Sequence, residues 1–145
     1  MHVAQLNIAR LLAPIESTKL AGFVRRLDEV NAVADGAPGF VWRLQGESGN
    51  ATDLRPWGDD VIVNMSVWES VAALRDYVYG PEHAAVLRRR RDWFGVLGAP
   101  HLVLWYVAVG HEPDLVEARE RLDRLERDGP GPEAFTLRAP FPVPA

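Results

Sequence analysis

The order of strand-like and helix-like segments is the feature of this sequence that most restricts its fold. The strand-like stretches, defined by alternation and by β-branched residues, are residues 2–12, 39–45, 61–68 and 101–109. The helical patterns, defined by apolar residues at helical spacing, cover residues 17–35, 69–79 and 82–97. This β-α-β-β-α-β order predicts a ferredoxin-like α+β protomer with four antiparallel strands and two helices on one face of the sheet.

Three further segments complete the expected organisation. A charged helix over residues 113–127 has only a narrow apolar strip, so we expect it to be a solvated outer element of a domain spanning residues 1–128. Residues 129–145 are rich in proline and predict an irregular tail. Residues 46–60 hold glycine, proline and acidic residues and predict a long loop, a class of segment that often serves as a lid. Trp57 is the residue of this loop that could close over a ligand.

Composition excludes several classes of protein. The chain has 145 residues with 48% apolar and 25% charged residues, which is typical of one globular domain. It has no cysteine, so disulfides, thiolate nucleophiles and cysteine-based metal sites are excluded. The net charge of −4 argues against nucleic acid as a partner. No apolar run approaches the roughly 18 residues of a membrane span, and the N-terminal residues lack the pattern of an export signal, so we expect a cytoplasmic location.

A single sheet with helices on one face leaves its other face uncovered. Val61, Val63, Met65 and Val67 share one face of the third strand and form an all-apolar row. Such a face must be covered, most simply by a second copy of the chain. The sequence therefore predicts a homodimer that associates through this sheet face.

Polar residues fall on positions that should face the helices. Asn7 lies on the first strand, and Asn64, Ser66 and Trp68 share a face of the third strand. Asn31 lies on the apolar stripe of the first helix. His83 and Arg90 are seven residues apart, so they lie two turns apart on the same side of the helix expected over residues 82–97. Burying such groups is costly unless they are paired, so the pattern indicates either a ligand pocket or a hydrogen-bonded structural network.

Known metal and cofactor motifs are missing from the sequence. None of the four histidines, His2, His83, His101 and His111, has the spacing of a zinc motif. The sequence has no glycine-rich phosphate loop and no dinucleotide-binding fingerprint. We therefore predict no metal site and no tightly bound organic cofactor.

Several stretches of the sequence resemble a family of uncharacterised bacterial domains. They are AQLNIARLLAP, GFVWRLQ, GNATDLRPW, VNMSVWESVAALRDYVY, HAAVLRRRRDWF, APHLVLWYVAVGH and GPGPEAFTL. The resemblance covers nearly the whole chain and is to a domain-of-unknown-function family of the dimeric α+β barrel superfamily, alongside the antibiotic-biosynthesis monooxygenases. It implies a ferredoxin-like protomer that pairs into a barrel, with a pocket between helices and sheet.

The same resemblance implies a heme-related alternative. Heme-degrading members of the superfamily use an asparagine on the first strand and a tryptophan at the end of the third, which Asn7 and Trp68 match. The histidine ligand of those proteins aligns near Leu87, which cannot ligate iron, so His83 would have to replace it from a shifted position.

Residues and resemblance together predict a small-molecule enzyme, of monooxygenase, cyclase or isomerase type, acting on an apolar or aromatic oxygen-bearing metabolite. His83 would be the general acid or base and Arg90 would hold an anionic or enolate oxygen. The expected substrate-binding residues are Asn7, Asn31, Trp42, Asn64, Ser66, Trp68 and Trp105. A heme-binding or heme-degrading protein and a non-catalytic module that binds a small ligand are the alternatives.

Overall fold

The computed structural model describes residues 1–46, 49–97 and 100–145. The strands are β1 (His2–Leu11), β2 (Phe40–Arg43), β3 (Val61–Trp68), β4 (Phe94–Gly95) and β5 (Leu102–Val107). The helices are η1 (Thr18–Leu20), α1 (Ala21–Asp35), α2 (Val71–Val78), α3 (Pro81–Arg88), α4 (Arg90–Trp93) and α5 (Leu115–Asp128). The expected α+β order is confirmed, with a short additional strand. Residues 47 and 48 of the expected loop 46–60 lie outside the described residues.

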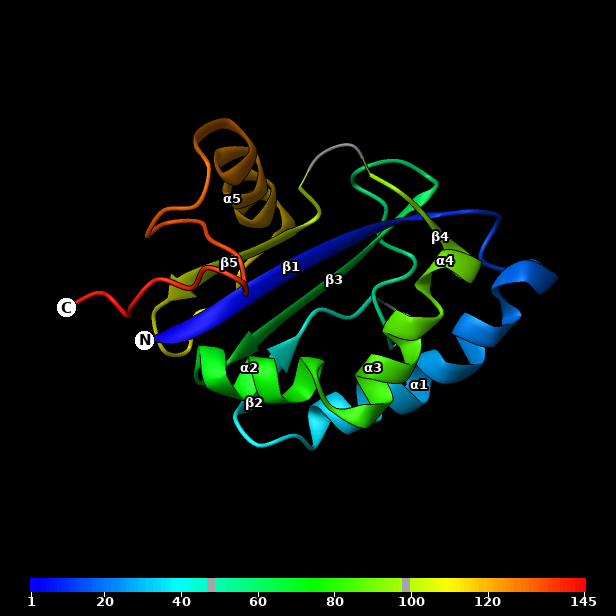
Figure 1. Ribbon diagram of the computed structural model, residues 1–145, viewed down its shortest axis with the longest axis horizontal. Helices are drawn as coiled ribbons and strands as arrows, with labels where there is room; N and C mark the ends of the chain where they lie inside the picture. Colours follow the sequence, from blue (N-terminus) through cyan, green and yellow to red (C-terminus); the bar gives the residue numbers. More distant parts are fainter. Residues whose placement is uncertain (47–48, 98–99) are drawn as a thin grey trace.

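The sheet is antiparallel and has β1 at its centre. On one side β1 pairs with β3, which in turn pairs with β2, and on the other side it pairs with β5 and, near its end, with β4. The register places Asn7 opposite Asn64 and Gln5 opposite Ser66. Because side chains alternate across a strand, these four polar residues share one face of the sheet. Helices α1 to α4 lie on one side of the sheet and α5 lies on the other (Figure 1).

The apolar row on β3 is already buried within the single chain, which corrects the expected interface. Val61, Val63, Met65 and Val67 are 1–4% exposed. They pack with Leu122 and the other apolar residues of α5 and with residues of the 46–60 loop. A second copy cannot contact this row while α5 stays seated on it. The homodimer stays a prediction, without this row as its interface.

Helix α5 covers one face of the sheet because the residues of its narrow apolar strip are buried against that face. Ala118, Leu122 and Leu125 recur at three- and four-residue spacing and are buried against the sheet, while the charged residues face outward. Asp114 caps the helix by accepting a hydrogen bond from the Glu117 backbone N–H at 2.8 Å. The helix is an outer element with a solvated charged face, as expected, and its narrow apolar strip suffices to seat it on the sheet.

The helix expected over residues 82–97 is interrupted. α3 ends at Arg88, α4 begins at Arg90, and Arg89 between them has φ −104° and ψ 9°. The chain then becomes extended at Phe94 and pairs with β1 as β4. Trp93, which is 1% exposed, packs with Phe23 and Leu20 and anchors the end of this segment. Burial of the indole, rather than helical propensity, sets the path of the chain here.

The C-terminal tail belongs to the core. Phe135 is fully buried and its backbone exchanges two hydrogen bonds with Leu104, at 2.8 and 2.9 Å, so the tail pairs with the outer edge of β5. The hydroxyl of Tyr106 donates to the carbonyl oxygen of Phe141 at 2.6 Å. The tail thus protects an edge strand that would otherwise expose its backbone. In the described parts of the chain, no helix combines the length and apolarity needed to traverse a lipid bilayer.

Candidate functional site

A chain of side-chain hydrogen bonds runs across the helix-facing side of β1 and β3. The amide nitrogen of Gln5 donates to Asn64 Oδ1 at 2.7 Å and to Ser66 Oγ at 2.8 Å. Ser66 Oγ also accepts from the indole nitrogen of Trp68 at 2.8 Å. Gln5, Ser66 and Trp68 are buried, so these bonds satisfy polar groups that would otherwise be costly to bury. The expected network of polar residues under the helices is present at Asn64, Ser66 and Trp68.

Asn64 is exposed although it lies in the middle of β3 and pairs with Asn7 on β1. On its other side the pairing of β3 with β2 ends at Ser66. Its neighbours on the same face, Ile62 and Ser66, are buried, and so is Trp68 beyond Ser66. Because Asn64 Oδ1 accepts the Gln5 hydrogen bond, its amide nitrogen keeps two N–H donors for another partner. Asn7, directly opposite on β1, is half-buried. The sheet therefore presents a polar, accessible spot between two buried regions.

A row of aromatic rings extends from the sheet to α3. Trp68 stacks on Tyr77 with 5.0 Å between ring centroids, and Tyr77 meets His83 edge-on at 5.2 Å. The Tyr77 hydroxyl donates to the Val30 carbonyl oxygen at 3.3 Å. Burial, with a smaller contribution from Asp35, raises the pKa of Tyr77 to about 12, so this phenol is a neutral structural group.

His83 is held neutral by its surroundings. Burial lowers the pKa of His83, and the Val78 backbone opposes this effect more weakly. Its Nδ1 atom is buried and has no hydrogen-bond partner among the residues that the structure describes. A neutral imidazole with an unpaired nitrogen can accept or donate a proton. The role of His83 as general acid or base stays a prediction.

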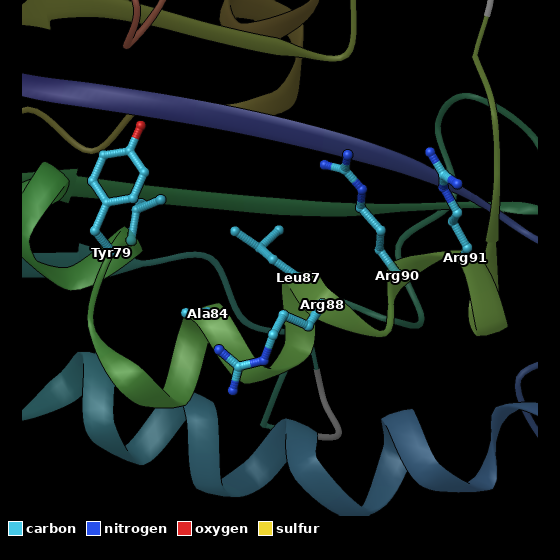
Figure 2. Close-up of a pocket in the computed structure, with 7 residues that line it drawn as sticks. Tyr79, Ala84, Leu87, Arg88, Arg90 and Arg91 are labelled. Carbon is cyan, nitrogen blue, oxygen red and sulfur yellow. The ribbon is translucent and has the colours of Figure 1, made fainter.

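A shallow cavity of about 520 Å³, largely open to solvent, lies beside α3 and α4. Its lining comes from the end of α2, the α2–α3 turn, α3 and α4, and consists of Val78, Tyr79, Ala84, Leu87, Arg88, Arg90 and Arg91. Figure 2 shows that Leu87, Arg90 and Arg91 extend toward the side on which β1 and β3 run. The cavity thus combines an apolar wall with hydrogen-bond donors.

The structure separates the two expected catalytic residues. Arg90 lines the cavity, whereas His83 is not among the lining residues and packs on Tyr77 instead. The interruption at Arg89 explains the difference, because seven residues no longer correspond to two turns of one helix. The expected alignment of His83 and Arg90 on one stripe is therefore wrong.

Two expected aromatic walls lie on the other face of the sheet. Trp42 and Trp105 pack with the residues beneath α5, and Trp105 donates its indole N–H to Glu117 at 2.8 Å. Trp57 also packs on that side, where the guanidinium of Arg119 lies 4.7 Å from its ring centroid. These three tryptophans do not line the cavity, because the sheet separates them from it. Asn31 is buried on α1, at the position its helical spacing predicted.

Tyr79, Leu87 and Arg91 line the cavity but were not among the expected site residues. Tyr79 is 66% exposed and follows α2 immediately before the Gly80–Pro81 break. The Gly80–Pro81 break beside Tyr79 is a signal that the sequence contains, since binding residues are often carried on the segments that connect regular elements. Arg91 had no comparable signal, because its direction depends on the break at Arg89.

The residues at the cavity do not fit heme held by histidine. Leu87 lines the cavity at the position where the axial ligand was expected, and the His83 ring is turned against Tyr77. Within residues 1–46, 49–97 and 100–145, no group of three or more His, Asp or Glu side chains is arranged to hold a metal ion. The cavity instead offers arginine, tyrosine and apolar groups.

Comparison with known proteins places the whole chain in one family. A family model described as a domain of unknown function (DUF3291) matches residues 2–145. No curated protein matches the sequence significantly. The resemblance to a domain-of-unknown-function family, predicted from the sequence, is thereby confirmed.

Solved structures share this fold. A conserved protein from Methanosarcina mazei Go1 has 6% identity and a TM-score of 0.54, covering 74% of this chain and 94% of its own. The protein NE2512 of unknown function from Nitrosomonas europaea has 12% identity and a TM-score of 0.51, covering 78% and 95%. SnoaB, a cofactor-independent oxygenase from Streptomyces nogalater, is a more distant match with 20% identity and a TM-score of 0.49, covering 74% and 93%.

Proposed function

This chain belongs to the DUF3291 family, and we propose that it is an enzyme for a small apolar or aromatic metabolite that carries oxygen atoms. The metabolite binds between the sheet and the α2–α4 segment and is converted without a tightly bound organic cofactor. The observation that carries this proposal is the cavity that Arg90 lines together with Ala84 and Leu87. Asn64 does not line this cavity, but it is exposed on the helix-facing side of the sheet, and in this proposal the ligand extends from the cavity toward it.

The size and lining of the cavity support a small organic ligand. A volume of about 520 Å³ lies within the range of about 300–1,000 Å³ that is usual for small-molecule sites. Val78, Ala84 and Leu87 provide an apolar wall for the body of the ligand. A few polar groups beside such a wall are typical of sites that orient their ligand.

The polar groups support chemistry at a ligand oxygen. The free N–H donors of Asn64 and the guanidinium of Arg90 would stabilise negative charge that develops on a carbonyl or phenolic oxygen. Gln5 holds the Asn64 amide in one orientation, so the donors are arranged before the ligand binds. Cofactor-free oxygenation requires such an anion, whereas a cyclase needs mainly shape and a proton donor. The proposal covers oxygenation, cyclisation and isomerisation.

His83 is the candidate acid or base. Its pKa is lowered by burial, so the ring is neutral near pH 7 and able to accept a proton. Trp68 and Tyr77 form the packed surface on which this ring rests. In this proposal Arg90 binds the oxygen together with Asn64. His83, which packs on Tyr77 and does not line the cavity, exchanges the proton with a part of the ligand that extends beyond the lining.

Measurements of turnover and of ligand binding test the proposal. A panel of naphthols, naphthoquinones and aromatic ketones is incubated with the protein, and products are followed by mass spectrometry and oxygen consumption. Nuclear magnetic resonance titration of the same compounds should shift the signals of Asn64, Tyr79 and Leu87. His83→Gln should lower turnover by about 10²–10⁴-fold and leave binding unchanged.

The control variant is Val116→Ala, which alters an exposed residue on the far side of the sheet. It should retain both binding and turnover. Binding at the cavity without turnover of any compound would instead make the chain a binding module. Signal changes confined to residues outside the cavity would contradict the proposal.

A further inference from the structure

The arginines of the run Arg88–Arg91 have two different roles. Arg89 forms an ion pair with Asp92 at 3.0 Å, and its guanidinium lies 5.2 Å from the centroid of the Trp93 ring. The other three line the cavity, and none of them has an ion-pair partner in the described part of the chain. One arginine of the run is therefore committed to structure, and three are available to a ligand.

Two of these arginines, Arg90 and Arg91, extend to the same side. Neighbouring residues of a continuous α-helix project about 100° apart. Arg90 and Arg91 are consecutive residues of α4, but Figure 2 shows their long side chains running in the same direction while Arg88 on α3 extends away from them. Two neighbouring guanidinium groups that point alike form a natural clamp for the oxygens of an anion.

The charge at the cavity contrasts with that of the whole chain. The sequence carries a net charge of −4, with 20 acidic against 16 basic residues. Yet of the described residues that line the cavity three are arginines and none is acidic. Like charges held close together repel, and a bound anion relieves this repulsion.

We infer that the ligand of this cavity is an organic acid whose carboxylate or equivalent oxyanion binds between Arg90 and Arg91. Its apolar body lies against Val78, Ala84 and Leu87. The inference rests on the proposed function, because it concerns the same cavity, and it narrows the substrate class from an oxygen-bearing metabolite to an anionic one.

A matched pair of probe ligands tests the effect of the ligand's charge separately from the effect of its shape. 2-Naphthoate and 2-naphthamide have the same ring system and planar head groups of similar size, and they differ in charge. Isothermal titration calorimetry should show that the protein binds the carboxylate about ten- to a hundredfold more tightly than the amide. The advantage should shrink as salt is raised from low to high concentration.

Two double variants complete the experiment. Arg90→Gln with Arg91→Gln should abolish the preference for 2-naphthoate and leave the affinity for 2-naphthamide within about threefold, because each arginine interaction with the carboxylate is lost. Arg25→Gln with Arg26→Gln removes the same charge from α1, where neither residue lines the cavity, and should keep the preference. Circular dichroism and denaturant unfolding verify that both variants fold.

The experiment distinguishes failure of the anion inference from failure of the proposed function. Equal affinity for the two probes, or a preference that survives in Arg90→Gln with Arg91→Gln, overturns the anion inference while leaving the cavity as a ligand site. Loss of the preference in the Arg25 and Arg26 control as well would show a general charge effect and also overturns it. No binding of either probe overturns the proposed function itself.

Discussion

Gln5 and Asn64 are joined by a hydrogen bond of 2.7 Å between the Gln5 amide nitrogen and the Asn64 side-chain oxygen, across two strands. The same nitrogen donates to Ser66, so both N–H groups of Gln5 are used. Gln5 is buried and Asn64 is exposed. A buried residue therefore sets the orientation of an accessible one, and the sheet itself prepares the donors that the proposed function uses.

Replacing Gln5 with Leu should destabilise the fold and weaken ligand binding. The substitution removes two hydrogen bonds from a buried position, and we expect the free energy of unfolding to fall by about 1–3 kcal/mol in urea denaturation. Asn64→Ala is the matched control, since its side chain is exposed and Gln5 can still donate to Ser66. Asn64→Ala should lower the free energy of unfolding by less than about 1 kcal/mol. Equal destabilisation by the two variants would contradict the assignment of the network.

Helix α5 should contribute strongly to stability, in contrast to what its charged sequence indicates. Leu122 is 4% exposed beneath α5 and Val116 on the same helix is 80% exposed. Leu122→Ala should lower the free energy of unfolding by about 2–5 kcal/mol because it opens a cavity in the core. Val116→Ala should change it by less than about 0.5 kcal/mol. If denaturant unfolding found similar small effects for both, α5 would not be seated on the sheet.

The loop 46–60 should be fastened to α5 by Arg119. Its guanidinium lies over the Trp57 ring and also donates to the Pro56 carbonyl oxygen at 3.3 Å. Arg119→Ala should lower the free energy of unfolding by about 0.5–1 kcal/mol, because an exposed cation–π pair contributes about that much to stability. A double-mutant cycle with Trp57→Leu measures the coupling directly. Arg127→Ala, which loses only the ion pair with its neighbour Asp128, should be nearly neutral, and a coupling energy of zero for Arg119 with Trp57 would refute the contact.

Much of the fold was accessible from periodicity. The strand expected over residues 61–68 is β3 to the residue, and the one expected over 2–12 is β1 with one residue fewer. Both succeed because β-branched and alternating residues signal a strand locally. The same alternation correctly placed Asn64, Ser66 and Trp68 on the helix-facing side. Local pattern thus predicted the floor of the site.

The features of the structure that the sequence did not predict depend on contacts between distant segments. The break at Arg89 occurs inside a run of good helix formers, and it follows from the burial of Trp93 against α1 and η1, which no local pattern reveals. The cover of the Val61–Val67 row also comes from elsewhere in the chain, since α5 could not be assigned to a face from its own sequence. The direction of Arg91 and the position of Trp105 were missed for these reasons.

The stability of the protein should depend on pH through His83. Burial lowers the pKa of His83 from the ordinary value of 6.5, so the unfolded chain binds a proton more readily than the folded chain does. The contribution of this ring to stability is complete above pH 6.5 and is lost as the pH falls from there through the lower folded pKa. Urea unfolding followed between pH 7.5 and 5 should therefore show a steeper loss of stability in the wild type than in His83→Gln. His101→Gln removes an exposed ring and should retain the wild-type slope. A His83→Gln protein that loses stability with pH as steeply as the wild type would show that the imidazole is as readily protonated in the folded chain as in the unfolded one, and the ring would then not be the neutral base of the proposed mechanism.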